Sequence, residues 1–594
     1  MATLLLVLAT FTGYVIAYHT YGRFLARRIF RVQPGAPVPS KTLEDGMDYV
    51  PTTRVVVFGH HFTSIAGTGP IVGPAIGILF GWVPALIWVF VGSIVMGAVD
   101  DFGALVISLR HQGRSIADIV AQYINPRVRF ICFLVVFLEL WIVIAIFGLV
   151  IAILFDLYPQ AVFPVWMQIP VAMTLGAYVR GRSRNVALGT LLAVVLLYLL
   201  IMLGDFLPIK MPAVAGIPPT GVWTILLMIY VFFASTLPVT TLLQPRDYIN
   251  AWQLFIMMVL LTLGVVGASL AGGLQIVAPA FNLEVGERAL GPLFPFLFVT
   301  IACGAISGFH SLVSSGTSSK QLYDESDAQA VGYGSMLLEG ALAVLVIVAV
   351  AAGIGMGYEA DGVQMTGAGA WNAHYGNVAA ASKLPGKVHA VVVGAANMMS
   401  TMRISPQLAA VIMGVFIASF AGTTLDTATR LQRYVIAELS TTVRMPAVGN
   451  RWIATGIAVV TGCVLAFSTG WGGSGAMVLW PMFGAVNQLL AALALLLISL
   501  YLRRRGGRKF LVTLLPCLFM LVMTVTAMFI KEKDFLLEVH ANLGQMGAGG
   551  EPFSWGVWLR AAVNGAALLL ALWMAVEGFV ALWRGERAQQ AATE

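Results

Sequence analysis

The stretch from Phe58 to Pro74, Phe-Gly-His-His-Phe-Thr-Ser-Ile-Ala-Gly-Thr-Gly-Pro-Ile-Val-Gly-Pro, decides the fold of this chain. It lies inside an apolar run long enough to cross a bilayer, yet it contains four glycines and two prolines. Proline removes a backbone donor and glycine lowers helix propensity, so a helix is predicted to break within 67–74, with carbonyls and amides freed at 67–70. Broken backbone is tolerated in hydrocarbon only where protein buries it or a polar cavity borders it, so the break predicts a binding site.

Composition predicts a polytopic membrane protein. Hydrophobic residues make up 59% of the 594 and charged residues 10%, against about 25% charged in a soluble domain. The net charge of +7 comes from Lys and Arg in short loops, which is typical of topology signals and not of a nucleic-acid partner. The four cysteines show neither zinc-type spacing nor a disulfide framework, and no nucleotide-binding or enzymatic signature occurs. We therefore expect a protein that is not an enzyme and that has no resident cofactor.

The hydropathy pattern predicts about fifteen spans of about 20 residues each. If the N-terminus is outside and the C-terminus cytoplasmic, nearly every basic cluster falls on the cytoplasmic side. Four lysines in outside loops are exceptions: Lys383, Lys387, Lys531 and Lys533. An apolar segment at 388–403 is short for a span and is left open as re-entrant. The predicted spans are 3–24, 54–80, 83–109, 127–155, 161–179, 185–204, 220–243, 252–278, 293–319, 330–355, 405–428, 452–468, 476–502, 510–530 and 556–583.

A second break is predicted in the seventh span, at Ser235-Thr-Leu-Pro-Val-Thr-Thr241. It lies five spans after the first break and in the opposite orientation. Two inverted five-helix units that each begin with a broken helix are the layout of a secondary transporter whose substrate binds near the midplane. The predicted domains are a peripheral first helix and loop (1–53), a first repeat (54–204), a second repeat (205–440) and peripheral C-terminal helices (441–594).

The two breaks supply the predicted substrate-binding residues. Half-helix amides attract an anionic group, and hydroxyls offer hydrogen bonds to a small polar substrate. The alternative is a kinked packing helix whose hydroxyls bond back to the preceding turn. The predicted residues are Gly67, Thr68, Gly69, Pro70, Ser235, Thr236 and Thr240.

The ninth span is dense in hydroxyls, which together with freed carbonyls suit a hard cation such as sodium. Helix association through small residues and hydroxyls is the alternative reading. The predicted cation-binding residues are Ala66, Gly67, Ser314, Ser315 and Thr317.

Ionisable residues inside spans are expensive, so they are predicted to carry a proton or to form buried pairs. The proton-coupling candidates are His61, Asp100, Glu139, His310 and Glu339. His60 and His61 are expected near water at the cytoplasmic end of the second span. Adjacent helical residues point about 100° apart, so a metal site on this pair is only a weak alternative.

Three motifs resemble the carbon starvation protein family, CstA, over about residues 1–500. They are the stretch 58–74, Ser-Gly-Phe-His-Ser-Leu-Val-Ser-Ser-Gly-Thr-Ser-Ser-Lys-Gln at 307–321, and Phe-Ala-Gly-Thr-Thr-Leu-Asp-Thr-Ala-Thr-Arg at 420–430. The resemblance implies a bacterial inner-membrane transporter for peptides or pyruvate during carbon starvation, a stress response. It also implies the LeuT-like inverted-repeat fold of the amino acid, polyamine and organocation superfamily, and it places 67–70 at the centre of the site.

We therefore expect a secondary active importer of a small carboxylate-bearing nutrient, peptide or pyruvate, in a bacterial plasma membrane. A proton or sodium gradient would drive it by alternating access. The expected partners are this small molecule and the lipid bilayer, with no nucleic acid, and the oligomeric state stays open. The alternative is a membrane sensor that binds a metabolite without transporting it.

Overall fold

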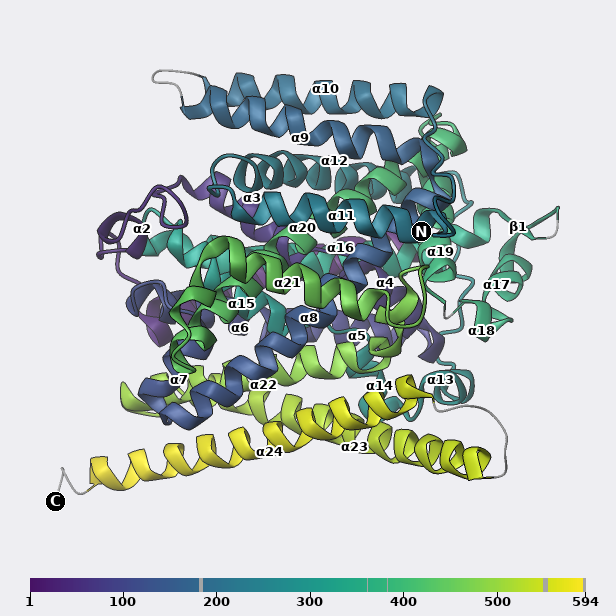
Figure 1. Cartoon of the computed structure of the whole chain (residues 1–594). Helices are drawn as coiled ribbons and strands as arrows, with labels where there is room; N and C mark the ends of the chain where they lie inside the picture. The colour runs from purple at the N-terminus through teal and green to yellow at the C-terminus, as the bar shows by residue number, and fades with distance from the viewer. Residues whose placement is uncertain (181–184, 361, 382, 548–553, 591–594) are drawn as a thin grey trace.

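The computed structural model describes residues 1–180, 185–360, 362–381, 383–547 and 554–590. Most of these residues form long helices that run side by side across one slab (Figure 1). At one end of the slab lies a hairpin of two antiparallel strands, β1 (Tyr358–Ala360) and β2 (Val363–Met365), next to the short helices α17 (Gly367–Tyr375) and α18 (Val378–Ala381). Two other short helices, α2 (Pro39–Thr42) and α7 (Ile116–Tyr123), lie at the opposite end.

Within the described residues, 12 helices are long and apolar enough to cross a membrane. A bent pair, α3 (Arg54–Ile65) and α4 (Gly69–Gly77), adds one more span with a bend of 42°. The other spans contain α1 (Ala2–Ala17), α5 (Trp82–Gly92) with α6 (Ala98–Arg110), α8 (Pro126–Leu157), α9 (Pro159–Arg180), α10 (Val186–Phe206), α11 (Pro219–Thr236), α12 (Leu243–Leu270), α16 (Ser335–Ala351), α20 (Pro406–Thr442), α22 (Trp480–Arg504), α23 (Leu511–Gly547) and α24 (Trp555–Gln590).

The predicted all-helical, polytopic class is confirmed, and each of the fifteen expected spans coincides with helix. Two of them contain no single helix long enough to cross a membrane. The span expected at 452–468 is α21 (Arg451–Ala466), which is apolar but short. The span expected at 293–319 is two short helices, α14 (Leu293–Thr300) and α15 (Gly308–Gly316), separated by a break. The segment left open as re-entrant, 388–403, belongs to the buried helix α19 (Leu384–Ser400).

The long central helices begin at caps that the sequence contains. The Asn125 side chain accepts a hydrogen bond from the Val128 amide at the start of α8, and Ser405 caps α20 in the same way. Each cap is followed by a proline in the first turn, where proline lacks only an amide that would be unpaired anyway. These helices, of 32 and 37 residues, pack against each other through the middle of the bundle.

The helix contacts repeat themselves within the chain. Five elements of the first half have a counterpart that makes the equivalent contacts in the second half. The counterparts, in order, are α14–α15 for α3–α4, α16 for α5–α6, α20 for α8, α21 for α11 and α22 for α12. Thus α12 packs on the first broken pair and α22 on the second, α11 packs on α8 as α21 packs on α20, and α12 meets α20 as α22 meets α8. The two broken pairs coincide with the second and ninth expected spans, an odd number of crossings apart, so they run in opposite directions. The core is therefore a five-plus-five inverted repeat.

In this arrangement α9 and α10 form an added hairpin at one edge, and α23 and α24 cover the opposite edge (Figure 1). The expected domain limits, 54–204 and 205–440, stay a prediction, although the exchange of helices starts the second repeat at α14. The N-terminus lies toward the end of the slab that carries β1, and α24 ends toward the other end, which carries α7 (Figure 1). Which end is cytoplasmic stays a prediction.

Candidate functional site

Two helix breaks face each other at the centre of the bundle. α3 ends at Ile65 and α4 begins at Gly69, while α14 ends at Thr300 and α15 begins at Gly308. A Cβ atom added to Gly69 would lie 2.5 Å from the Cβ of Cys303, in the second break. Only glycine allows this approach, because real side chains do not come so close. The backbone of one break therefore packs directly on the other.

Side chains from neighbouring helices satisfy the backbone groups that the second break frees. The indole N–H of Trp88, on α5, donates to the Ile301 carbonyl at 2.8 Å. On α22, the Asn487 side-chain oxygen accepts from the Phe309 amide at 2.9 Å and from the Ser307 hydroxyl at 3.1 Å. Buried backbone groups need such partners, so the break is a built feature of the fold.

A cavity of about 380 Å³ lies against both breaks. Its wall comes from α4, α8, α14, α19, α22 and α23 and from α13 (Leu283–Leu290), so it lies toward the end of the slab that carries α13. This size suits a small molecule. The residues that line it include Thr68, Gly69, Val72, Gly73, Phe147, Phe296, Thr300, Cys303, Lys387, Trp480 and Lys531.

The charged side chains on the cavity wall are two lysines. Lys387 is 6% exposed, and its ammonium lies 5.0 Å from the centre of the Trp480 ring. The Lys531 ammonium lies 4.9 Å from the centre of the Phe296 ring and 3.7 Å from a carboxylate oxygen of Asp534. Burial lowers the pKa of Lys387 to about 8. Among the described residues Lys387 has no carboxylate partner, so its charge is available to an anion in the cavity.

The opposite end of the central helices is closed by a loop. Asp48 precedes α3 and forms ion pairs with Arg430 and Arg433 of α20. Arg430 also donates to the Leu237 carbonyl at 3.1 Å, and the Val239 amide donates to the Met47 carbonyl at 3.0 Å. Burial opposes ionisation of Asp48, but the two guanidinium groups outweigh it and hold the pKa of this carboxyl well below its ordinary value.

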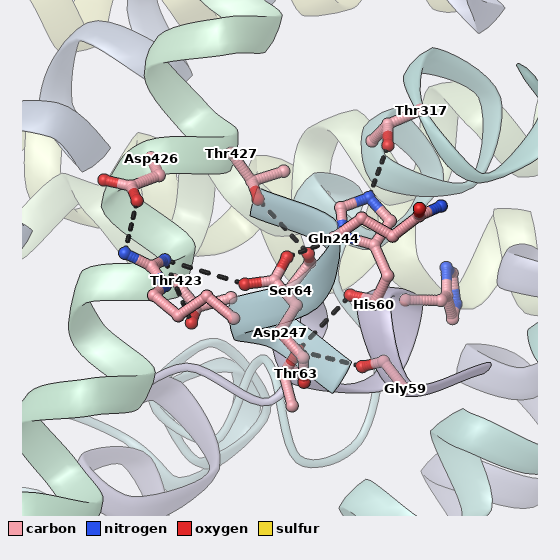
Figure 2. Close-up of polar contacts among 12 residues, drawn as sticks. Gly59, His60, Thr63, Ser64, Gln244, Asp247, Thr317, Thr423, Asp426 and Thr427 are labelled. Carbon is pink, nitrogen blue, oxygen red and sulfur yellow. Dashed lines mark hydrogen bonds and ion pairs between the residues drawn. The ribbon is translucent and has the colours of Figure 1, made fainter. Parts of the chain in front are cut away.

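A buried ionic network ties α3 to the helices around it (Figure 2). His60 Nδ1 lies 2.6 Å from Asp247 Oδ2 on α12, and His60 Nε2 lies 2.7 Å from the Thr317 hydroxyl just after α15. Arg246, also on α12, lies 3.6 Å from Asp247 and 2.5 Å from Asp426 on α20. All of these ionisable side chains are buried.

A second buried cluster joins α6, α15 and α16. His310 Nδ1 lies 3.3 Å from Asp101 Oδ2, and His310 Nε2 lies 3.4 Å from Glu339 Oε2. The predicted candidates His310 and Glu339 are thus brought together, with Asp101 as the third member. Asp100 and Glu139 are buried with no hydrogen-bond partner among the described residues.

Of the predicted substrate residues, the structure places Thr68 and Gly69 at the cavity, with Gly67 and Pro70 beside them in the break. It does not bring Ser235, Thr236 and Thr240 there. These residues lie where α11 ends and a turn leads into α12, so the expected break in one helix is a turn between two. Ser235 donates to the Asp426 carbonyl at 3.2 Å and Thr236 to the Phe233 carbonyl at 2.8 Å. The facing break is at 301–307 instead.

The predicted cation residues do not converge on one point. Ser315 donates to the Ser311 carbonyl at 2.7 Å and accepts from the Ile116 amide, on the side of α7. Thr317 bonds His60 on the side of α3, and Ser314 is buried without a partner among the described residues. Ala66 and Gly67 lie in the other break.

His60 and His61 were expected near water, but both are buried, at 1% and 0% exposure. His61 Nδ1 lies 2.8 Å from the Ser318 hydroxyl, so the two rings take different partners. No group of three or more metal-ligating side chains occurs in the part of the chain that the structure describes. The weak metal alternative therefore gains no support.

Sequence reasoning missed Arg246 and Asp247 because it assigned residues 244–251 to a loop, and it gave no role to Asp426, which lies in the span expected at 405–428. Pro245 suggested a break, yet it lies in the first turn of α12, where proline is tolerated. The sequence did contain a signal for Lys387 and Lys531 as candidate site residues, because both were exceptions to the positive-inside pattern.

Comparison with known proteins gives a consistent set of similarities. The family described as "Carbon starvation protein CstA" matches residues 2–527. The chain is 32% identical to "Peptide transporter CstA" of Campylobacter jejuni, covering 88% of this chain and 80% of that one. It is 31% identical to "Pyruvate/proton symporter BtsT" of Escherichia coli, covering 89% and 82%.

Two solved structures align over most of this chain at low sequence identity. A manganese transporter of Eremococcus coleocola has a TM-score of 0.49 and 11% identity, covering 91% of this chain and 99% of that one. MhsT in complex with L-phenylalanine has a TM-score of 0.46 and 11% identity, covering 88% and 99%.

Proposed function

Because this chain belongs to the carbon starvation protein CstA family, we propose that it is a secondary active importer of small carboxylate-bearing nutrients. Its relatives are named as a peptide transporter and as a pyruvate/proton symporter, and both of those substrates carry a carboxylate. The sensor alternative has no counterpart among these names. We place the protein in a bacterial plasma membrane, with the N-terminus outside.

The cavity between the two breaks carries this proposal. It contains the N-terminal end of α4 at Gly69, whose amides favour an anion, and the ammonium groups of Lys387 and Lys531. Apolar side chains such as Phe147 and Val72 form much of the remaining wall. A carboxylate with a short apolar or peptide body matches this mixture of charge and apolar surface.

The two ends of the core differ in a way that supports alternating access. The cavity lies toward the end that carries α13, while the Asp48 loop and its two arginines close the other end. With the proposed topology, this state faces outward. Transport then requires the Asp48 ion pairs to separate while the cavity closes on its substrate.

The test is uptake into proteoliposomes of labelled pyruvate and of a labelled dipeptide, with proton and sodium gradients imposed separately. The proposal expects gradient-driven accumulation of at least one substrate, and competition by the other carboxylate identifies a shared site. Absence of both uptake and substrate exchange, in protein shown to be folded, would refute the transporter assignment.

A further inference from the structure

The His60–Asp247 contact joins two helices with different roles in the core. His60 lies in α3, the first half of a broken helix, and Asp247 lies in α12, which is continuous (Figure 2). The other ring nitrogen of His60 reaches Thr317, just beyond the second half of the other broken helix. One imidazole therefore fastens both broken helices to α12.

The network around this contact lacks one positive charge. Asp247 and Asp426 are both fully buried, and the Arg246 guanidinium lies between them. Two carboxylates and one guanidinium leave a net negative charge, which is costly in a buried site unless it is compensated. A proton on His60, 2.6 Å from Asp247, supplies the missing charge.

Other ionisable groups near α3 are already engaged or too remote to supply it. On α3 itself, His61 bonds Ser318. On the elements packed against α3, His310 of α15 contacts Glu339 of α16, Arg430 and Arg433 of α20 pair with Asp48, and Lys320, in the turn after α15, lies over the rings of Tyr49 and Tyr434. The Tyr230 hydroxyl, on α11, donates to Asp426 at 2.8 Å.

The same geometry disfavours a metal cation at this place. The Arg246 guanidinium lies 3.2 Å from the Thr423 hydroxyl, and Thr424, next in α20, donates to the Ser64 carbonyl at 3.4 Å beside the break. A fixed cation thus stands between α12 and α20, where it already neutralises part of the carboxylate charge. A proton adds charge here without adding volume.

We infer that the His60–Asp247 pair binds the coupling proton and acts as a proton-dependent latch between α3 and α12. While the proton is bound, the network is neutral and α3 stays docked. Undocking of α3 exposes His60 to water, and the proton leaves on the side to which α3 opens. This inference rests on the proposed transport function and assigns its coupling ion and the residues that bind it.

The test compares two modes of transport in proteoliposomes. Proton-driven accumulation of labelled pyruvate needs a net transfer of the bound proton in each cycle, whereas exchange of internal for external pyruvate under symmetric pH needs no net proton movement. His60→Gln and Asp247→Asn keep hydrogen-bonding groups but remove the titrating charge. We expect each to lower proton-driven accumulation at least about fivefold, the lower end of ordinary coupling between two sites, and to retain exchange.

His374→Gln is the matched control, because His374 bonds Tyr358 at the hairpin end, away from the network. It should keep both modes. The Glu339→Gln variant distinguishes the two buried clusters. If His60→Gln and Asp247→Asn accumulate pyruvate like the wild type, or if only Glu339→Gln uncouples, the inference is wrong. If the wild type shows neither accumulation nor exchange, the transport function itself fails.

Discussion

Replacing Lys387 by Met should weaken carboxylate binding in the cavity while leaving the turnover of bound substrate nearly unchanged. Lys387 is 6% exposed, and no carboxylate neutralises it among the described residues. A hydrogen bond to a charged group contributes about 1.5–3 kcal/mol, and each 1.4 kcal/mol is tenfold, so KM for pyruvate should rise about 10- to 100-fold. Lys531 is 30% exposed at its side chain and pairs with Asp534, so Lys531→Met should cost less.

The assay is the concentration dependence of labelled pyruvate exchange under symmetric pH, which separates binding from the driving gradient. Lys383→Met is the matched control, because Lys383 is exposed at the start of α19. An unchanged KM for Lys387→Met would refute the assignment of this cavity to the carboxylate. A lower maximal rate at unchanged KM would point to a structural role instead.

The pKa of Lys387 also predicts a pH dependence. Burial lowers this pKa to about 8, so the ammonium is charged below that pH and neutral above it. Affinity for the anion should therefore fall as the pH rises from 7 to 9. Lys387→Arg should remove this dependence, because a guanidinium stays protonated throughout the range. The same fall in Lys387→Arg would show that a group other than Lys387 causes it.

Three further variants test the architecture around the site. Gly69→Ala should abolish transport, because its Cβ would lie 2.5 Å from the Cβ of Cys303. The double variant with Cys303→Gly should restore part of the transport, and failure to do so would contradict the direct packing of the two breaks. Asp48→Asn should weaken the closure by Arg430 and increase labelling of cysteines placed at the closed end by an impermeant thiol reagent, and unchanged labelling would show that the loop is no gate. Asn487→Leu should destabilise the break by about 1–3 kcal/mol per unpaired backbone group, measured as a lower thermal unfolding temperature in detergent, and wild-type stability would contradict the role of Asn487.

Much of the architecture was readable along the chain because it depends on local composition. Length and apolarity predicted the spans, and Gly67 to Pro70 predicted the first break from proline and glycine chemistry alone. Reliance on local composition also misplaced the second break, which was predicted at 235–241. Pro238 is an obvious local signal, but it serves a turn between α11 and α12, whereas the break at 301–307 is marked in the sequence only by Gly304 and by Gly308 at the start of α15.

The sequence by itself determined that this chain is a helical membrane protein with a broken helix in its second span, since hydrophobic length and backbone chemistry act within a few turns. Only the tertiary structure decided which residues meet. His60 is 187 residues from Asp247, and Asp426 lies on a third helix. The burial of such charges is tolerated only when distant partners compensate them, and that compensation depends on helix packing, which no local pattern records.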